Sequence, residues 1–162
     1  MNQIIRCLPV LGALFLVACG GGGGGATTHT LAAAPRLADG TLAFEQLANV
    51  SYSGVQTPTT FVVRDSESMQ KLWYSTYLNI FPVPDLPNVD FTRKMVLAVA
   101  WGYVDPCSSY AIDRVAISGG MVAVNYHLTP PLPTMMCAAV VTAPVQMIVV
   151  DRIDTTVNFI RN

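Results

Sequence analysis

The sequence predicts an α+β domain with a mainly antiparallel β-sheet and one packed helix. The order of its patterns is the first observation: strand-like segments, a single helix-like segment, then strand-like segments with no helix between them. The second is residues 95–101, an unbroken apolar run that is too short for a membrane helix. Such a run is typical of a strand buried on both faces, although a short buried helix has a similar pattern. The chain has 162 residues, which is enough for one domain.

The elements before the apolar run follow from local patterns. Residues 42–55 have mixed periodicity and indicate an opening strand that breaks at Gly54. Residues 59–64 are a clearer strand because they are rich in β-branched and aromatic side chains. A helix then starts at Asp65 or Ser66, either of which can cap its first N–H groups, and stops near Asn79. Its apolar face consists of Met69, Leu72, Trp73 and Tyr77, and we expect it to pack on the sheet. A binding surface is the alternative interpretation of this aromatic stripe.

Within residues 89–102, the apolar run 95–101 is the predicted central strand; a turn-prone Asp-Phe-Thr stretch precedes it and Gly102 ends it. The next pair of strands, 110–117 and 122–128, is joined by a hairpin turn in which Gly119 and Gly120 supply positive φ angles. Alternation in the return strand places Val122, Val124, Tyr126 and Leu128 on one face and His127 on the other. Residues 145–150 and 156–160 are the last predicted strands.

The amino terminus predicts export. Arg6 precedes an apolar run over residues 8–18, so residues 1–18 have the layout of a signal peptide. The run ends in Leu-Val-Ala-Cys-Gly, and this stretch resembles the lipobox of bacterial lipoproteins. The resemblance implies that Cys19 becomes the first mature residue and carries a diacylglyceryl group and an N-acyl chain such as palmitate. An ordinary signal peptide with a chance cysteine is the alternative interpretation.

The lipid anchor would set the location of the protein. Three acyl chains on Cys19 hold a protein at the membrane far more firmly than one chain does. Gly20 stands where an inner-membrane retention signal would typically have Asp, so we expect outer-membrane residence if the host has two membranes. The anchor would therefore place the protein in the cell envelope.

Residues 19–42 are predicted to be a flexible tether, and residues 43–162 the folded domain. Six consecutive glycines follow Cys19, and the next residues contain few large apolar groups, so this segment cannot bury enough surface to order itself. A phosphate-binding glycine loop is the alternative. It is disfavoured because the glycines lack a preceding strand, a following helix and a Lys-Ser/Thr pair.

Charge limits the classes of partner. The chain has 9 Lys and Arg against 10 Asp and Glu, and no basic run, which argues against nucleic acid as a partner. Charged residues make up only 12% of the chain. Part of this low fraction comes from the apolar leader. The remainder indicates a sizeable core or an apolar surface that contacts a partner.

The cysteines separate into two groups. Cys7 lies in the leader and Cys19 at the lipidation position, so Cys107 and Cys137 remain in the domain. An exported, oxidising setting favours a disulfide between them. A zinc site is the rival interpretation, but His127 is the only histidine left in the domain to join these cysteines, and there is no Cys-x-x-Cys pair.

The sequence does not indicate an enzyme. It has no Gly-x-Ser-x-Gly elbow, and His127 is an isolated histidine on the polar face of a strand. The aspartates lie mostly at turns or strand ends, where capping carboxylates are common. An envelope hydrolase that uses Asp90 or His127 stays as an alternative hypothesis. No cofactor is expected.

Short motifs across the domain resemble the carboxy-terminal domain of the PrcB protease-complex subunit family. They are Ser53-Gly54-Val55, Leu72-Trp73, Val89-Asp90-Phe91, Tyr110-Ala111-Ile112 and Thr142-Ala143-Pro144-Val145. The resemblance covers residues 51–150. The family takes its name from a lipoprotein needed for assembly of a surface protease complex, and it supplies no catalytic residues. This chain departs from the family at residues 105–109, where members often have a glycine-rich turn.

Together these observations predict a lipid-anchored protein-interaction module of the cell envelope. An accessory or stabilising subunit of a secreted protease or another envelope complex fits the resemblance. A small-ligand-binding lipoprotein is the alternative function. The expected partner-binding residues lie in two proline-rich loops, whose extended segments lose little entropy on binding. They are Phe81, Pro82, Pro84, Pro130, Pro131 and Leu132.

Overall fold

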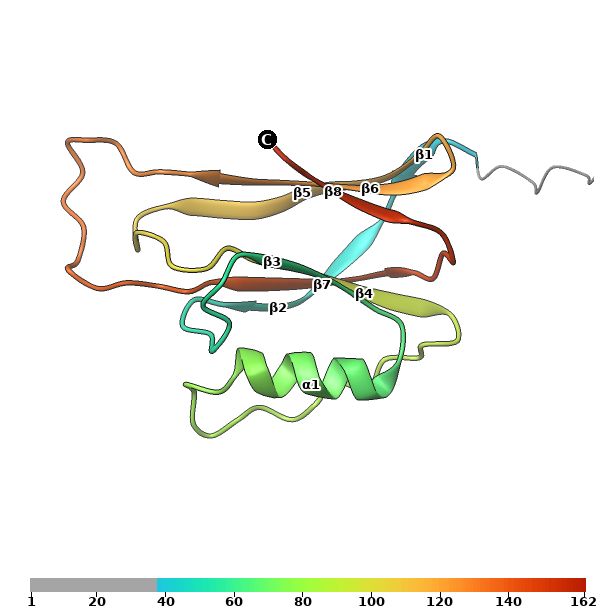
Figure 1. The fold of residues 1–162 in the computed structure, drawn as a ribbon, viewed down its shortest axis with the longest axis horizontal. Helices are drawn as coiled ribbons and strands as arrows, with labels where there is room; N and C mark the ends of the chain where they lie inside the picture. Colours follow the sequence, from blue (N-terminus) through green and yellow to red (C-terminus); the bar gives the residue numbers. More distant parts are fainter. Residues whose placement is uncertain (1–37) are drawn as a thin grey trace, which may run out of the picture. The chain divides into compact units, whose positions relative to one another are not determined.

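The computed structural model describes residues 38–162, which form one helix and eight strands (Figure 1). The predicted signal peptide, the lipidation position Cys19 and most of the predicted tether lie outside the described residues. No helix within residues 38–162 is long and apolar enough to cross a membrane. The elements are β1 (Gly40–Leu42), β2 (Phe44–Val50), β3 (Thr59–Val63), α1 (Ser66–Thr76), β4 (Lys94–Ala100), β5 (Ser109–Ser118), β6 (Met121–Thr129), β7 (Val145–Asp151) and β8 (Val157–Arg161).

The strands form two sheets, and the helix covers one of them. The first sheet has the order β1-β5-β6-β8, and the second has the order β2-β7-β4-β3. Figure 1 shows three layers, with α1 on the outer face of the second sheet and the first sheet on its other face. All strand pairs are antiparallel except β6 and β8, which are parallel. The predicted α+β fold class is confirmed, whereas the division into two sheets was not foreseen.

Strand β4 is the centre of the fold. It pairs with β3 on one side and β7 on the other, and each residue from Met95 to Ala100 is at most 2% exposed. Met95, Leu97 and Val99 pack between the two sheets, while the alternate residues pack under the helix. A strand in this position buries both faces, which explains its unbroken apolar sequence and excludes the short buried helix.

The helix begins and packs as its sequence predicts. The Asp65 carboxylate accepts a hydrogen bond from the backbone N–H of Ser68 at 2.8 Å, and this caps the first turn. Met69, Leu72 and Trp73 are buried against the second sheet. The regular helix ends at Thr76, slightly before the predicted stop near Asn79.

Strand β1 was not predicted. Its three residues fall at the end of the predicted tether, yet Thr41 and Leu42 pair with Ala116 and Val115 of β5. A three-residue segment is too short to show a strand period, so only its pairing with β5 reveals it. The ordered structure therefore extends to the amino-terminal side of residue 43.

The hairpin of β5 and β6 agrees with the sequence. Gly119 and Gly120 have φ values of 59° and 81°, as a tight turn of this kind requires. A register shift between Ile112 and Arg114 introduces a bulge into β5. The N–H of Ile112 donates to the Gln146 side chain at 2.7 Å, and this buried bond joins the two sheets.

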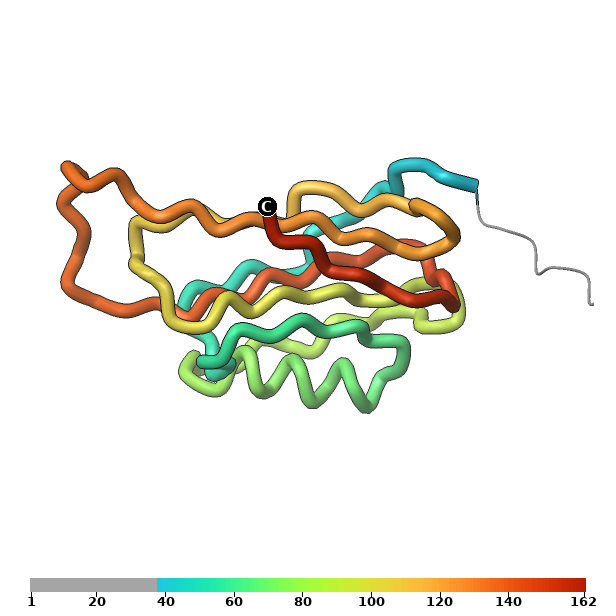
Figure 2. The backbone as a smooth tube through the Cα atoms, turned by 45° about the horizontal axis from the view of Figure 1, so that its top comes forward, coloured from blue at the N-terminus to red at the C-terminus, as the bar shows by residue number. Residues whose placement is uncertain are grey.

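The two ends of the layered domain differ in character. We call the end formed by residues 51–58, 77–84, 101–108 and 130–144 the loop end, and the end with the Gly119–Gly120 turn the hairpin end. Figure 2 shows residues 130–144, in orange and red, extending from the loop end. The described chain begins at the hairpin end, where the Gly119 N–H donates to Asp39 at 3.0 Å.

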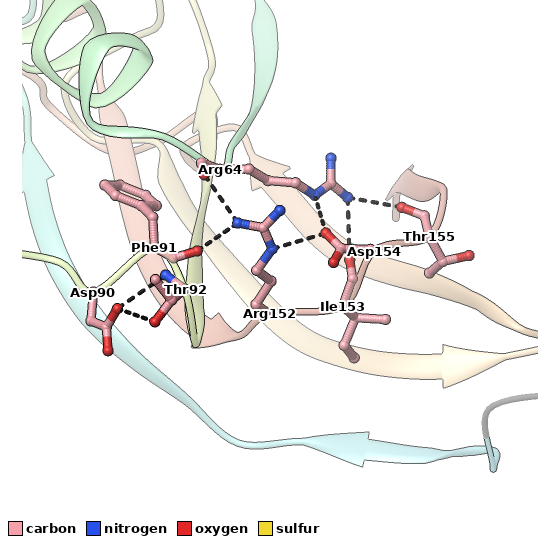
Figure 3. A network of polar contacts seen from close by, with 8 residues as sticks. All are labelled: Arg64, Asp90, Phe91, Thr92, Arg152, Ile153, Asp154 and Thr155. Atoms are coloured by element: carbon pink, nitrogen blue, oxygen red, sulfur yellow. Dashed lines mark hydrogen bonds and ion pairs between the residues drawn. The ribbon is translucent and has the colours of Figure 1, made fainter.

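A polar network fixes the hairpin end (Figure 3). The Arg152 guanidinium donates to Asp154 at 2.9 Å and to the carbonyl oxygen of Phe91. Arg64, which follows β3, donates to the carbonyl oxygen of Thr155 at 2.8 Å. These bonds join the turns before β4 and before β8, so side chains at the hairpin end hold this end of the domain together.

Three exposed carboxylates predict acid destabilisation. The pKa of Asp65 is lowered by its hydrogen bonds from Ser68, that of Asp90 by Thr92, and that of Asp151 by Lys94. A carboxyl group with a lowered pKa in the folded state stabilises the fold above its unfolded pKa, near 3.8, and loses this contribution as pH falls through the folded value. We expect urea midpoints to fall between pH 7 and about pH 3, and to fall less after joint replacement of these aspartates by asparagine. Equal falls in both proteins would contradict this assignment.

Candidate interaction surface

The loop end exposes a group of large apolar side chains. Phe81 is 95% exposed and Met136 is 98% exposed, although such side chains are usually at least partly covered. The full group at this end is Tyr52, Leu78, Phe81, Val83, Tyr103, Leu132, Met135, Met136, Val140 and Val141. Asp105 is the only charged residue in the four segments that form the loop end. An exposed apolar surface with so little charge is typical of a binding surface.

The structure brings the two predicted proline-rich loops to this end. Phe81 and Leu132 are both exposed, and so are Pro82, Pro84 and Pro130, whereas Pro131 is half-buried. A hollow of about 320 Å³ lies between the loops. It is lined by Tyr52, Ser53, Gln56, Asn79, Tyr103, Val141 and Ala143. None of the six predicted residues is among those that line the hollow.

The loop that contains Pro82 and Pro84 is anchored to the helix. The indole N–H of Trp73 donates to the carbonyl oxygen of Pro84 at 3.0 Å, and the Trp73 ring packs against Tyr77 with centroids 4.5 Å apart. The Phe81–Pro82 peptide bond is cis. Phe81 is thus presented to solvent by a loop whose base is fixed to the core.

The second loop is held by the disulfide that the sequence predicts. Cys107 and Cys137 are bonded, with Cα atoms 5.9 Å apart, and join the turn after β4 to residues 130–144. Backbone bonds between Val104 and Thr142, at 2.9 and 3.1 Å, add a second connection. The apolar side chains of this loop therefore lie on a cross-linked support.

The cysteines do not form the rival zinc site. Asp105 is near both sulfur atoms, but sulfurs joined in a disulfide are not thiolates and are poor zinc ligands. His127 is not part of this group among the described residues.

His127 has a partner that the sequence analysis did not find. Its Nδ1 lies 2.8 Å from a carboxylate oxygen of Asp113 across the β5–β6 pair, on the outer face of the first sheet. The β5 bulge places Asp113 on this face, and no sequence spacing signals a bulge here. Within residues 38–162, no hydrogen bond joins His127 to a hydroxyl or thiol that could act as a nucleophile.

Asp90, the other candidate of the hydrolase hypothesis, serves a turn. Its carboxylate accepts from the Thr92 backbone N–H at 3.0 Å, and its carbonyl oxygen accepts from Lys94 at 2.8 Å. Asp90 bonds to Thr92 in the turn before β4, whereas His127 on β6 bonds to Asp113 on β5. The structure therefore does not bring these two residues together as an acid–base pair.

Comparison with known proteins adds no relative. No protein-family model matches the chain, and neither a curated protein nor a solved structure shows significant similarity to it. The function must therefore be inferred from the exposed surfaces of the chain and from its sequence.

A second concave surface lies beside strand β3. A groove of about 680 Å³ runs between β3, the segment at residues 54–57 and helix α1. Leu72 and Phe61 contribute apolar surface, while Ser68, Lys71 and Ser75 belong to the helix side. The sequence analysis considered only the helix face that packs on the sheet, so it missed this groove.

Proposed function

We propose that this chain is a lipid-anchored protein-interaction module of the cell envelope, and that its loop end binds a protein partner. An accessory or stabilising subunit of a secreted protease or another envelope complex is the role that we favour. The exposed apolar loop end carries this proposal. The lipobox-like sequence at Cys19 and the resemblance to the PrcB family support it independently.

The charge of the loop end favours a protein over a lipid surface as its target. Anionic membranes attract Lys and Arg, and the four segments of the loop end contain neither. Protein interfaces, in contrast, are enriched in aromatic residues and methionine at their centre. Phe81, Met135 and Met136 supply these residue types in exposed positions.

The position of the loop end also suits this role. Residue 38, which leads back toward the predicted tether, lies at the hairpin end, together with Asp39 and the Gly119–Gly120 turn. A partner that covers the loop end would therefore leave the start of the folded chain uncovered. The anchor and the binding surface can then act at the same time.

Capture from the native envelope tests this function. The tagged full chain is purified after gentle solubilisation, and co-purifying proteins are quantified by mass spectrometry. We expect one stoichiometric partner, with recovery reduced about tenfold or more by joint Phe81→Ala and Leu132→Ala replacement, because exposed apolar anchors are typical hot spots. Met121→Ala removes an exposed apolar side chain beside the Gly119–Gly120 turn, at the hairpin end, and should leave recovery unchanged. Equal recovery with the loop-end variant, or no partner at all, would refute the proposal.

A further inference from the structure

Strand β3 is an unprotected sheet edge. It pairs with β4 through an uninterrupted register from Thr59 to Val63, and its other side makes no backbone hydrogen bond within residues 38–162. Its sequence, Thr-Thr-Phe-Val-Val, contains no charge and no proline. Exposed edges normally carry such features because free N–H and C=O groups pair with other strands.

The other three edge strands carry features that disfavour pairing with an added strand. Strand β2 has a register shift between Gln46 and Ala48 and contains Glu45. Strand β1 has only three residues, and β8 contains the charged Arg161. Among the edges that the structure describes, β3 is therefore the one suited to accept another strand.

Hollows flank β3 on both faces of its sheet. The 680 Å³ groove lies on the helix side, and a hollow of about 200 Å³ lies on the side of the other sheet. The smaller hollow is lined by Thr60, Trp101, Tyr126 and Arg161, among others. Successive side chains of a strand point to opposite faces, so a strand added to β3 would direct them alternately into the two hollows.

Each hollow contains a single charged residue, and both charges are positive. Lys71 lines the larger groove and Arg161 lines the smaller hollow, and neither is lined by an acidic residue. Lys71 contacts Glu67 at 2.6 Å, but both side chains are about three-quarters exposed, so this pair holds the Lys71 ammonium weakly. Arg161 makes no ion pair within the described part of the chain. An incoming strand with acidic side chains on both faces would complement these charges.

We propose that β3 binds an extended acidic peptide segment of another protein by strand addition between α1 and β8. Main-chain hydrogen bonds to the free edge supply affinity, and acidic side chains at Lys71 and Arg161 supply selectivity. The two hollows share residues 54–58 and Trp101 with the loop end, whereas β3, Lys71 and Arg161 lie outside its four segments. The proposal does not depend on the function of the loop end. A second copy of the chain is a poorer occupant, because its own β3 would bring no acidic side chain to either cation.

A synthetic peptide with the sequence Val-Glu-Thr-Val-Glu-Val tests the proposal, since its two glutamates lie on opposite faces of a strand. We expect the solubilised full chain to bind the fluorescein-labelled peptide with a Kd below about 1 mM. Replacing both glutamates by glutamine should weaken binding about 3- to 10-fold. N-methylation of alternate backbone amides should abolish binding for one set of positions and spare it for the other, because only one edge of the peptide pairs with β3. Hydrogen exchange of the free β3 amides should slow on binding.

Variants of the chain provide the matched controls. Lys71→Glu and Arg161→Glu together should reject the glutamate peptide and accept a peptide with lysine in place of both glutamates. Arg114→Glu, on the outer face of the first sheet, and joint Phe81→Ala and Leu132→Ala should bind as the unaltered chain does. The proposal fails if the glutamate peptide does not bind, if N-methylation has no effect, or if charge reversal does not exchange the peptide preference. It also fails if β3 amides are protected by self-association without peptide, which would make a second copy the occupant.

Discussion

We expect joint replacement of Cys107 and Cys137 by serine to lower the free energy of unfolding by about 3–4 kcal/mol. The disulfide closes a loop with a sequence separation of 30 residues, and the chain-entropy model assigns a loop of this size a stabilisation in that range. The loss arises mainly because the unfolded chain gains conformations that the cross-link excludes. Urea denaturation under oxidising conditions measures the difference from the unaltered chain.

Two controls separate the cross-link from the side chains. Reduction of the unaltered chain should give the stability of the double serine variant, because both remove the same bond. Ser108→Ala changes a neighbouring side chain and keeps the disulfide, so its effect should stay within about 0.5 kcal/mol. If the double variant loses less than about 1 kcal/mol in free energy of unfolding, the entropic account fails. Either the denatured chain keeps residual structure in this segment, or other contacts hold the segment in the folded state.

The disulfide also bears on the proposed interface. Residues 130–144 contain no helix or strand and expose Leu132, Met135 and Met136, so little else orders this part of the loop end. Fixing the loop before binding reduces the entropy lost when a partner docks. Loss of the bond should therefore weaken partner capture even at temperatures where the domain stays folded.

Local patterns were sufficient to predict most of the fold. The apolar run of β4, the cap at Asp65 and the Gly119–Gly120 turn each depend on neighbouring residues, and each appears in the structure. The division of the strands into two sheets could not be predicted in the same way. Leu97 and Val96 are both buried residues of one strand, and only the tertiary structure shows that one faces a sheet and the other a helix.

The surfaces were predicted less completely for a related reason. The exposed positions of Phe81 and Leu132 followed from proline-rich sequence, which favours loops. The pairing of His127 with Asp113 depends on a bulge, and the groove beside β3 depends on which strand lies at an edge. Strand order is set by long-range pairing, so no local pattern in residues 59–63 shows that one side of β3 is free.

Trp73→Ala should destabilise the fold by about 3–5 kcal/mol, which is the usual cost of removing a large buried aromatic side chain. Trp73 is 4% exposed and packs in the core between α1 and the second sheet. Its N–H bond to Pro84 also connects this core to the loop that presents Phe81. The substitution therefore removes core packing and loop anchoring together, and urea denaturation followed by far-UV circular dichroism measures the sum.

Trp73→Phe separates the two contributions. Phenylalanine keeps an aromatic ring in the core and loses the N–H donor, so we expect a smaller loss of about 1–2 kcal/mol. Tyr74→Ala removes a half-exposed ring from the same helix and should change the free energy of unfolding by less than about 0.5 kcal/mol, apart from the difference in helix propensity between the two residues.

The Trp73→Phe variant also tests whether the indole N–H anchors the loop. The Pro84 carbonyl can bond to water once the indole N–H is removed, so the loop loses its connection to the helix. We therefore expect faster proteolysis of residues 77–84 in the folded protein as the main effect. If Trp73→Ala is as stable as the unaltered chain, Trp73 does not hold the helix on the sheet. If Trp73→Phe is cleaved no faster than the unaltered chain, the Trp73 N–H does not anchor the loop.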